Sequence, residues 1–134
     1  MALIMSRVVC LALTNFVDGI SGIEAFLSQG PTPPRGRTVV IHPDPGQREG
    51  PLGNPDRDLR VEFQTTSIGE TPEQALWTHD QVSGALTRAE IALEDATALP
   101  VYPVEGSEQP VTRDEFLAEP TFLVTQSWVI LAQQ

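Results

Sequence analysis

A histidine–aspartate pair is the first group of side chains in the sequence that could support catalysis or bind a metal. His42 stands two residues before Asp44 in VVIHPDPG, residues 39–46. A histidine and a carboxylate at this spacing could bind a metal ion or exchange a proton. A zinc site, however, needs three or four ligands, and the chain has one further histidine, His79, and one cysteine, Cys10.

A different interpretation places His42 at the end of a strand. Residues 37–42 are rich in β-branched side chains, and Asp44 lies between two prolines, which favour extended backbone. His79 falls on the apolar side of a predicted helix, where a histidine is more often a hydrogen-bonded core residue than a ligand. The sequence contains none of the P-loop, nucleophile-elbow, H-E-x-x-H, C-x-x-C or G-x-G-x-x-G motifs. We therefore expect no enzyme, catalytic residue, metal or cofactor; the alternative is a small metal-dependent enzyme that uses His42, Asp44 and His79.

The helix that would carry His79 has a clear start. Thr71 is suited to the N-cap, Pro72 to the first helical position, and Gln74 completes a T-x-x-Q capping box. The residues expected on its buried face are Ala75, His79, Val82 and Leu86.

Trp77 falls on the opposite, polar side of this helix. Large aromatic side chains are enriched where subunits meet, so Trp77 is a candidate interface residue. The alternative is that Trp77 packs under a neighbouring loop or under the first helix.

Two strands are expected to form the centre of a sheet. Residues 59–68 alternate apolar and polar side chains, and residues 121–134 form a long strand with a core face that includes Trp128. The second face of each strand is partly apolar or charged, which suggests contact with a partner. The interface candidates on these faces, besides Trp77, are Arg60, Glu62, Leu123 and Val129.

The remaining segments complete a single domain over residues 1–134, which is long enough for one core. Residues 2–16 form an amphipathic helix or, alternatively, a signal peptide, although Arg7 interrupts the apolar run; this run is too short to span a membrane. Residues 43–58 form a long projecting loop, and residues 87–99 either extend the second helix or turn back as a strand. Residues 99–105 are expected to form a strand at an edge or a bulge, because they contain Pro100 and Pro103. The predicted fold class is α+β: an antiparallel sheet of roughly four strands with helices on one face, in the order α-β-β-α-β-β.

The charge of the chain excludes one class of function. The net charge is −10, which argues against a protein that binds nucleic acid, because such proteins present a basic face to the phosphates.

The stretch from VVIHPDPG through RVEFQTTSIGETPEQALWTHDQVSGAL to EPTFLVTQSWVIL resembles the tail terminator, or tail completion, proteins of long-tailed bacteriophages. The resemblance lies in size, in element order and in two patterns, V-x-F-Q-x-x-S-x-G and T-x-x-Q-A-x-W-x-x-D-x-V. It covers residues 37–86 more closely than the rest of the chain.

This resemblance implies a structural protein without catalytic activity. It would form a homo-oligomer, a hexameric ring, that stops growth of the tail tube and contacts both the tail tube protein and the head–tail connector or neck protein. The location would be the tail–neck region of the virion, with assembly in the host cytoplasm, no membrane contact, and DNA passing through without specific binding. The alternatives are a neck or head-completion protein of the same assembly and a secreted binding module. The loop that could reach a neighbouring ring contains Gln47, Arg48, Glu49, Leu52, Asn54 and Arg57.

Overall fold

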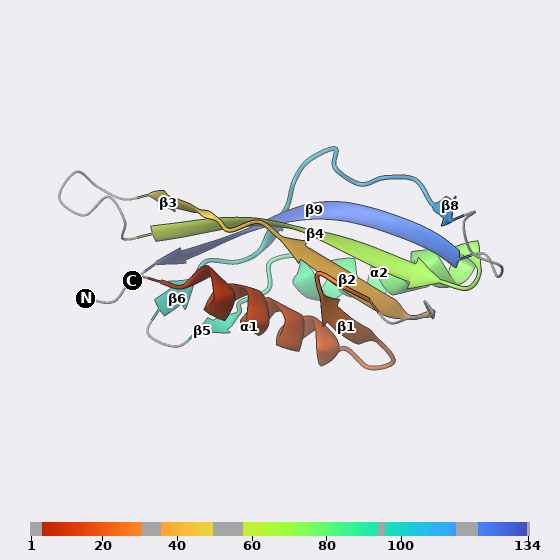
Figure 1. Ribbon diagram of the computed structural model, residues 1–134, viewed down its shortest axis with the longest axis horizontal. Helices are drawn as coiled ribbons and strands as arrows, with labels where there is room; N and C mark the ends of the chain where they lie inside the picture. Colours follow the sequence, from red (N-terminus) through yellow and green to blue (C-terminus); the bar gives the residue numbers. More distant parts are fainter. Residues whose placement is uncertain (1–3, 31–35, 50–57, 94–95, 115–120, 134) are drawn as a thin grey trace.

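The computed structural model describes residues 4–30, 36–49, 58–93, 96–114 and 121–133. Within these ranges the chain forms two helices and one sheet of nine strands (Figure 1). The elements are α1 (Ser6–Asp18), β1 (Glu24–Leu27), β2 (Thr38–Pro43), β3 (Gln47–Glu49), β4 (Asp58–Gly69), α2 (Pro72–Leu86), β5 (Ala92–Leu93), β6 (Ala96–Ala98), β7 (Tyr102–Pro103), β8 (Thr112–Asp114) and β9 (Thr121–Gln133).

The two long strands β4 and β9 form the centre of the sheet. They pair antiparallel from Asp58 opposite Gln133 to Gly69 opposite Phe122. The strand order is β1-β2-β4-β9-β6-β5, with β3 also paired to β4 and with β7 and β8 also paired to β9. The short strands β6, β7 and β8 thus follow one another along the second edge of β9.

The prediction of a four-stranded antiparallel sheet in the order α-β-β-α-β-β is wrong. The sheet has nine strands in the described residues and is mixed, because β1 runs parallel to β2. The strands that the sequence did not reveal, β1, β3 and β8, are three or four residues long. A segment of that length shows too little alternation for a periodic signal, and it is held in the sheet by backbone pairing to a long neighbour. Strand β7 falls within the strand expected at residues 99–105, and β5 and β6 fall within residues 87–99, where a returning strand was one of two alternatives.

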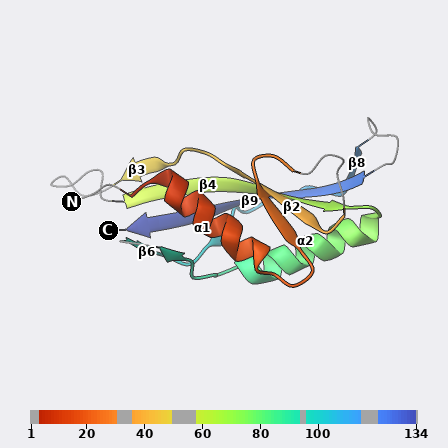
Figure 2. The ribbon, with the colours of Figure 1, turned by 60° about the horizontal axis from the view of Figure 1, so that its bottom comes forward.

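Both helices pack on the same face of the sheet (Figure 2). We call this the helix-covered face, and the opposite one the second face. The side chains between helices and sheet include Val9, Leu13, Val82, Leu86, Val39, Ile41, Leu59, Val61, Phe63, Trp128 and Ile130. No helix in the described part of the chain has both the length and the apolar character that crossing a membrane requires.

Helix α1 presents a different face to the core than its polar residues suggest. Its buried residues are Val9, Cys10, Leu13 and Val17, so Cys10 is buried although it shares one side of the helix with Ser6 and Thr14. The Thr14 hydroxyl is satisfied inside the helix, where it donates to the Cys10 carbonyl oxygen at 2.9 Å. The apolar side chains that face away from the core are Met5, Val8 and Leu11.

The predicted loop of residues 43–58 is shortened from both ends. Strand β2 includes Pro43, residues 47–49 pair with β4 as β3, and Asp58 begins β4. Gly46 joins β2 to β3 with a φ of +85°, and a Cβ there would lie 2.8 Å from the Leu59 side chain. A glycine is therefore required at this turn, both by the positive φ and by the lack of space.

Candidate subunit interface

The histidine–aspartate pair forms a turn in the structure. His42 is exposed near the end of β2, opposite Gln64 of β4. Asp44 lies just after this strand: its backbone N–H donates to the Glu62 carbonyl at 3.1 Å, and its side-chain Oδ1 accepts from the Gly46 N–H at 2.8 Å. Asp44 thus holds the turn that connects β2 to β3, which is a structural task.

His79 lies on the other side of the sheet from His42. It is buried on α2, and its Nε2 contacts the carboxylate of Glu108, on the segment between β7 and β8. His42 pairs in register with Gln64, on the second face of the sheet. The residues of the enzyme alternative are therefore not brought together, and the described residues contain no group of three or more metal-ligating side chains that could hold an ion.

The start of α2 positions the candidate Trp77. The Thr71 hydroxyl accepts a hydrogen bond from the Gln74 N–H at 3.1 Å, and the Gln74 side-chain oxygen accepts from the Glu70 N–H at 2.7 Å. This confirms Thr71 as the N-cap and Gln74 as its partner, except that the glutamine reaches Glu70 rather than Thr71 itself. The cap fixes the first turn, and Trp77 follows on the exposed side of the second.

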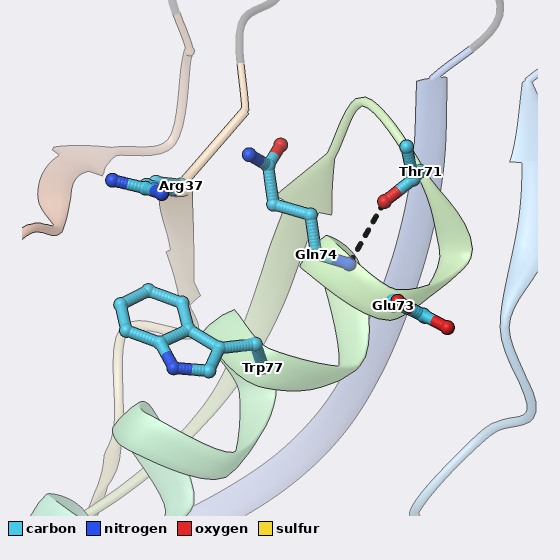
Figure 3. A pocket seen from close by; sticks show the side chains of 5 residues that line it. All are labelled: Arg37, Thr71, Glu73, Gln74 and Trp77. Atoms are coloured by element: carbon cyan, nitrogen blue, oxygen red, sulfur yellow. Dashed lines mark hydrogen bonds between the residues drawn. The ribbon is translucent and has the colours of Figure 1, made fainter.

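Trp77 is half-exposed and stacks with a cation. The Arg37 guanidinium lies 5.4 Å from the centre of the Trp77 ring, within range of a cation–π contact (Figure 3). Arg37 has a φ of 59°, and its backbone bonds to Ile68 and Glu24 hold it between β1 and β4. A Cβ on Gly22 would lie 3.6 Å from Trp77, so the turn after α1 also borders the ring.

Trp77 and Arg37 border an open hollow on the surface. The other residues that line it are Thr71, Glu73 and Gln74, and its volume is about 400 Å³ (Figure 3). The Trp77 ring offers an apolar wall, while Arg37 and Glu73 offer opposite charges. No nucleophile stands beside a base among these five residues, since the Thr71 hydroxyl is engaged in the cap. The hollow suits a side chain from another protein better than a chemical reaction.

The candidates on β4 and β9 form a second, separate group. Glu62 stands directly opposite Val129, Arg60 opposite Leu131, and Leu123 opposite Ile68, all on the second face of the sheet. Glu62 is exposed and Leu123 half-buried, but Val129 is only 1% exposed within one chain. Arg60, Glu62, Leu123 and Val129 thus share one face of the sheet. Arg60, Glu62 and Val129 are neighbours there, whereas Leu123 lies six residues further along β9, and Trp77 lies apart from all four on the side of the helices.

The candidate residues of the loop 43–58 fall in two places. Gln47, Arg48 and Glu49 belong to β3, whereas Leu52, Asn54 and Arg57 lie outside the described residues. The Arg48 guanidinium donates to the Ile4 carbonyl at 2.8 Å and so ties β3 to the chain just before α1.

Sequence reasoning missed four exposed apolar residues. Met5 at the N-cap of α1, Val8 and Leu11 on α1, and Leu76 on α2 are between 38% and 60% exposed. The three-residue spacing of the first three was visible in the sequence. Helix α1 is apolar on two sides, however, and periodicity alone does not indicate which side faces the core.

Comparison with known proteins adds a likeness in fold. No protein-family model matches the chain, and no curated protein matches its sequence. The fold is similar to that of a chain in the solved structure titled "Virion of native gene transfer agent (GTA) particle", with a TM-score of 0.72 and 11% sequence identity. The match covers 99% of this chain and 100% of that chain. At this identity the comparison shows a shared fold over the whole length of both chains.

Proposed function

We propose that this chain is a structural protein of a phage-like virion, and that it forms the ring that ends the tail tube and joins it to the head. The observation that carries the proposal is the end-to-end likeness in fold to a chain of a gene transfer agent virion. The narrower role as a tail terminator rests on the sequence resemblance of residues 37–86. Within the described residues, the dispersed histidines and the absence of a grouped metal-ligand set are compatible with a role that involves no catalysis.

A ring requires that each subunit carry two different contact surfaces, one for each neighbour. The chain offers separate candidates on its two sides. Trp77 and the hollow beside it lie on the helix side, and Arg60, Glu62, Leu123 and Val129 lie on the second face of the sheet. We assign Trp77 to contact between subunits, in a ring of six as the family resemblance implies. On the second face, the exposed Glu62 and the half-buried Arg60 and Leu123 would supply any new contact area, because Val129 is already buried.

The proposed neighbours along the tail axis are the tail tube protein on one side and the connector or neck protein on the other. The segment 43–58 is assigned to contact a neighbouring ring through Gln47, Arg48, Glu49, Leu52, Asn54 and Arg57. Arg48 also has a task inside the subunit, since it holds the Ile4 carbonyl. Its replacement would therefore affect α1 as well as the assembly, and the exposed Gln47 is the cleaner position to test.

The decisive experiment is deletion of the gene in the particle system that encodes it. For a terminator, tubes should grow beyond their normal length and remain separate from heads, and a tagged wild-type copy should restore both length and joining. Tails of normal length that fail to join heads would instead indicate a neck or head-completion protein. Normal, joined tails, or absence of the protein from purified particles by mass spectrometry, would refute the proposal.

A further inference from the structure

The exposed large apolar side chains of the described residues gather mainly on the two helices. The first group lies on α1, and we call Met5, Arg7, Val8 and Leu11 the α1 patch. The second lies on α2, and we call Glu73, Leu76, Trp77, Asp80 and Gly84 the α2 patch. Outside the helices, Leu99 and Tyr102 are the other exposed large apolar residues within the described ranges.

The α1 patch is apolar with one positive charge. Met5 is 60% exposed, Val8 38% and Leu11 40%. Arg7 lies one helical turn from Leu11 and is exposed beside it. The only other charged residue of α1 is Asp18, at its far end, so the first half of the helix is purely basic.

The α2 patch is apolar with negative charge. Leu76 is 45% exposed and Trp77 41%. At 100° per residue, Glu73 and Asp80 project between these two side chains, from the turns before and after. Helix α2 carries no lysine or arginine, and Arg37 is the cation placed over Trp77.

Gly84 gives the α2 patch a second feature. It lies one turn beyond Asp80, inside a helix that runs to Leu86, and a Cβ at this position would have no atom of the described residues within 4 Å outside the adjacent backbone. Glycine inside a helix weakens it, and no contact among the described residues requires a glycine here. A neighbouring helix that packs closely against α2 would explain why this position has no side chain.

We infer that the α1 patch of one copy docks on the α2 patch of the next copy, helix against helix. This inference rests on the proposed function, because a ring needs two different surfaces that complement each other. It assigns the α1 patch, in place of the second face of the sheet, as the surface of the next copy that Trp77 meets. The apolar residues Met5, Val8 and Leu11 would cover Leu76 and Trp77. Arg7 would face Glu73 and Asp80. The two helices would come closest to each other at Gly84. The charges on the two patches are opposite, which favours this pairing over a patch meeting itself.

The placement of the helices allows one copy to hold two neighbours. Helices α1 and α2 begin toward opposite ends of the long axis of the molecule, and their C-terminal ends meet near the middle (Figure 2). The α1 patch occupies the first two turns of its helix, and most of the α2 patch the first three turns of its own. The two patches are thus separated along the molecule, as contact between successive subunits requires.

The test uses two variants of the full chain, each altered in one patch. Leu11→Glu brings a negative charge toward the acidic α2 patch, and Leu76→Arg brings a positive charge toward Arg7. Both positions are exposed, so circular dichroism and thermal melting should be unchanged. Each variant alone should associate about tenfold more weakly, or worse, in analytical ultracentrifugation. Leu99→Glu, at a position 39% exposed and outside both patches, is the matched control and should assemble as the wild type does.

Mixing the two variants makes the test specific. An equimolar mixture contains one intact pairing, between the α1 patch of Leu76→Arg and the α2 patch of Leu11→Glu, and one altered pairing in which the two introduced charges are opposite. The mixture should therefore associate into species of two or more alternating copies, at concentrations where neither variant associates alone. Arg7→Glu should likewise weaken assembly, and a second change, Asp80→Arg, in the same chain should restore it.

Three results would overturn the inference: variants that assemble as the wild type, a variant that pairs with itself as well as with the other, or a wild type that stops at dimers. These outcomes separate the contact from the function. If the variants assemble normally while the wild type still forms a ring in particles, the contact is wrong and the function stands. If the patches pair as described but purified particles lack the protein, the function is wrong and the contact stands.

Discussion

Trp128 illustrates how one polar atom in the core is satisfied. It is fully buried on β9, and its indole N–H donates to the Thr65 hydroxyl of β4 at 3.0 Å. Apolar neighbours enclose the rest of the ring, so the hydroxyl provides the hydrogen bond that a buried N–H needs. The hydroxyl at position 65 is therefore a structural requirement of the core.

We predict that Thr65→Val destabilises the protein by about 1–3 kcal/mol, because it leaves the Trp128 N–H buried without an acceptor. Thr66→Val is the control: it lies one residue further on, on the second face and partly exposed, and should change stability by less than about 0.5 kcal/mol. Urea unfolding followed by tryptophan fluorescence measures both. Equal effects of the two substitutions would contradict this account.

Cys10 should be unreactive in the folded protein. It is buried on the inner side of α1, and burial, with a smaller contribution from the charge of Asp44, raises the pKa of its thiol. The reactive thiolate is therefore scarce at neutral pH. We predict that a maleimide labels the native chain far more slowly than the urea-unfolded chain. Fast labelling in the native state would mean that α1 opens readily.

The raised pKa of Cys10 also has a consequence for stability. A thiol whose pKa is higher in the folded state than in the unfolded state stays protonated in the fold. The stability that this difference in pKa provides is complete at pH values below the pKa of the unfolded thiol, about 8.5. It is lost as pH rises through the pKa of the thiol in the folded protein. Cys10→Ala should remove this loss of stability at alkaline pH without introducing another titrating group.

Among the elements, α2 depends on its cap. Thr71→Ala removes the acceptor for the Gln74 N–H and should cost about 0.5–2 kcal/mol, whereas Thr71→Ser keeps the hydroxyl and should cost much less. The cap also fixes the turn that precedes Trp77, so Thr71→Ala should weaken assembly in proportion to the loss of helix at the α2 patch. Urea denaturation combined with ultracentrifugation tests both effects.

Two glycines of neighbouring elements should respond in opposite directions. Gly84→Ala should stabilise the isolated subunit by about 0.5–1 kcal/mol, because a helix favours alanine and the added methyl meets open space. Gly69→Ala should destabilise it, because the methyl would lie 2.7 Å from the Ala75 Cα. If Gly84 serves a close contact, its alanine variant should melt at a higher temperature and yet assemble less well; equal assembly would argue against that use.

The elements differ in how well the sequence could predict them. The buried face of α2 is confirmed at Ala75, His79, Val82 and Leu86, because a long amphipathic helix with a cap has strong local signals. The alternation of β4 and β9 was equally readable. The same was not true of β1 or β8, whose place depends on the strand beside them rather than on their own residues.

The candidate site shows the same limit at the scale of the whole molecule. Trp77 could be named from its place on the wheel of α2, but Arg37, far away in sequence, is brought to it by the pairing of β1 and β2. The exposure of Met5, Val8 and Leu11 depends on which side of α1 meets the sheet. Such relations between distant segments exist only in the folded chain, and one sequence carries no local signal for them.

The charge of the whole molecule gives the last prediction. A subunit that surrounds DNA during its passage must not hold it, and a chain of net charge −10 has few cations with which to displace counterions from phosphates. We predict no saturable binding to a short DNA duplex by fluorescence anisotropy at 50 mM salt, for the subunit and the assembled form alike. If the second face of the sheet lines the channel, Glu62→Arg with Gln64→Arg should create binding in the assembly that falls steeply with salt. Tight binding by the wild type would contradict the proposed passage.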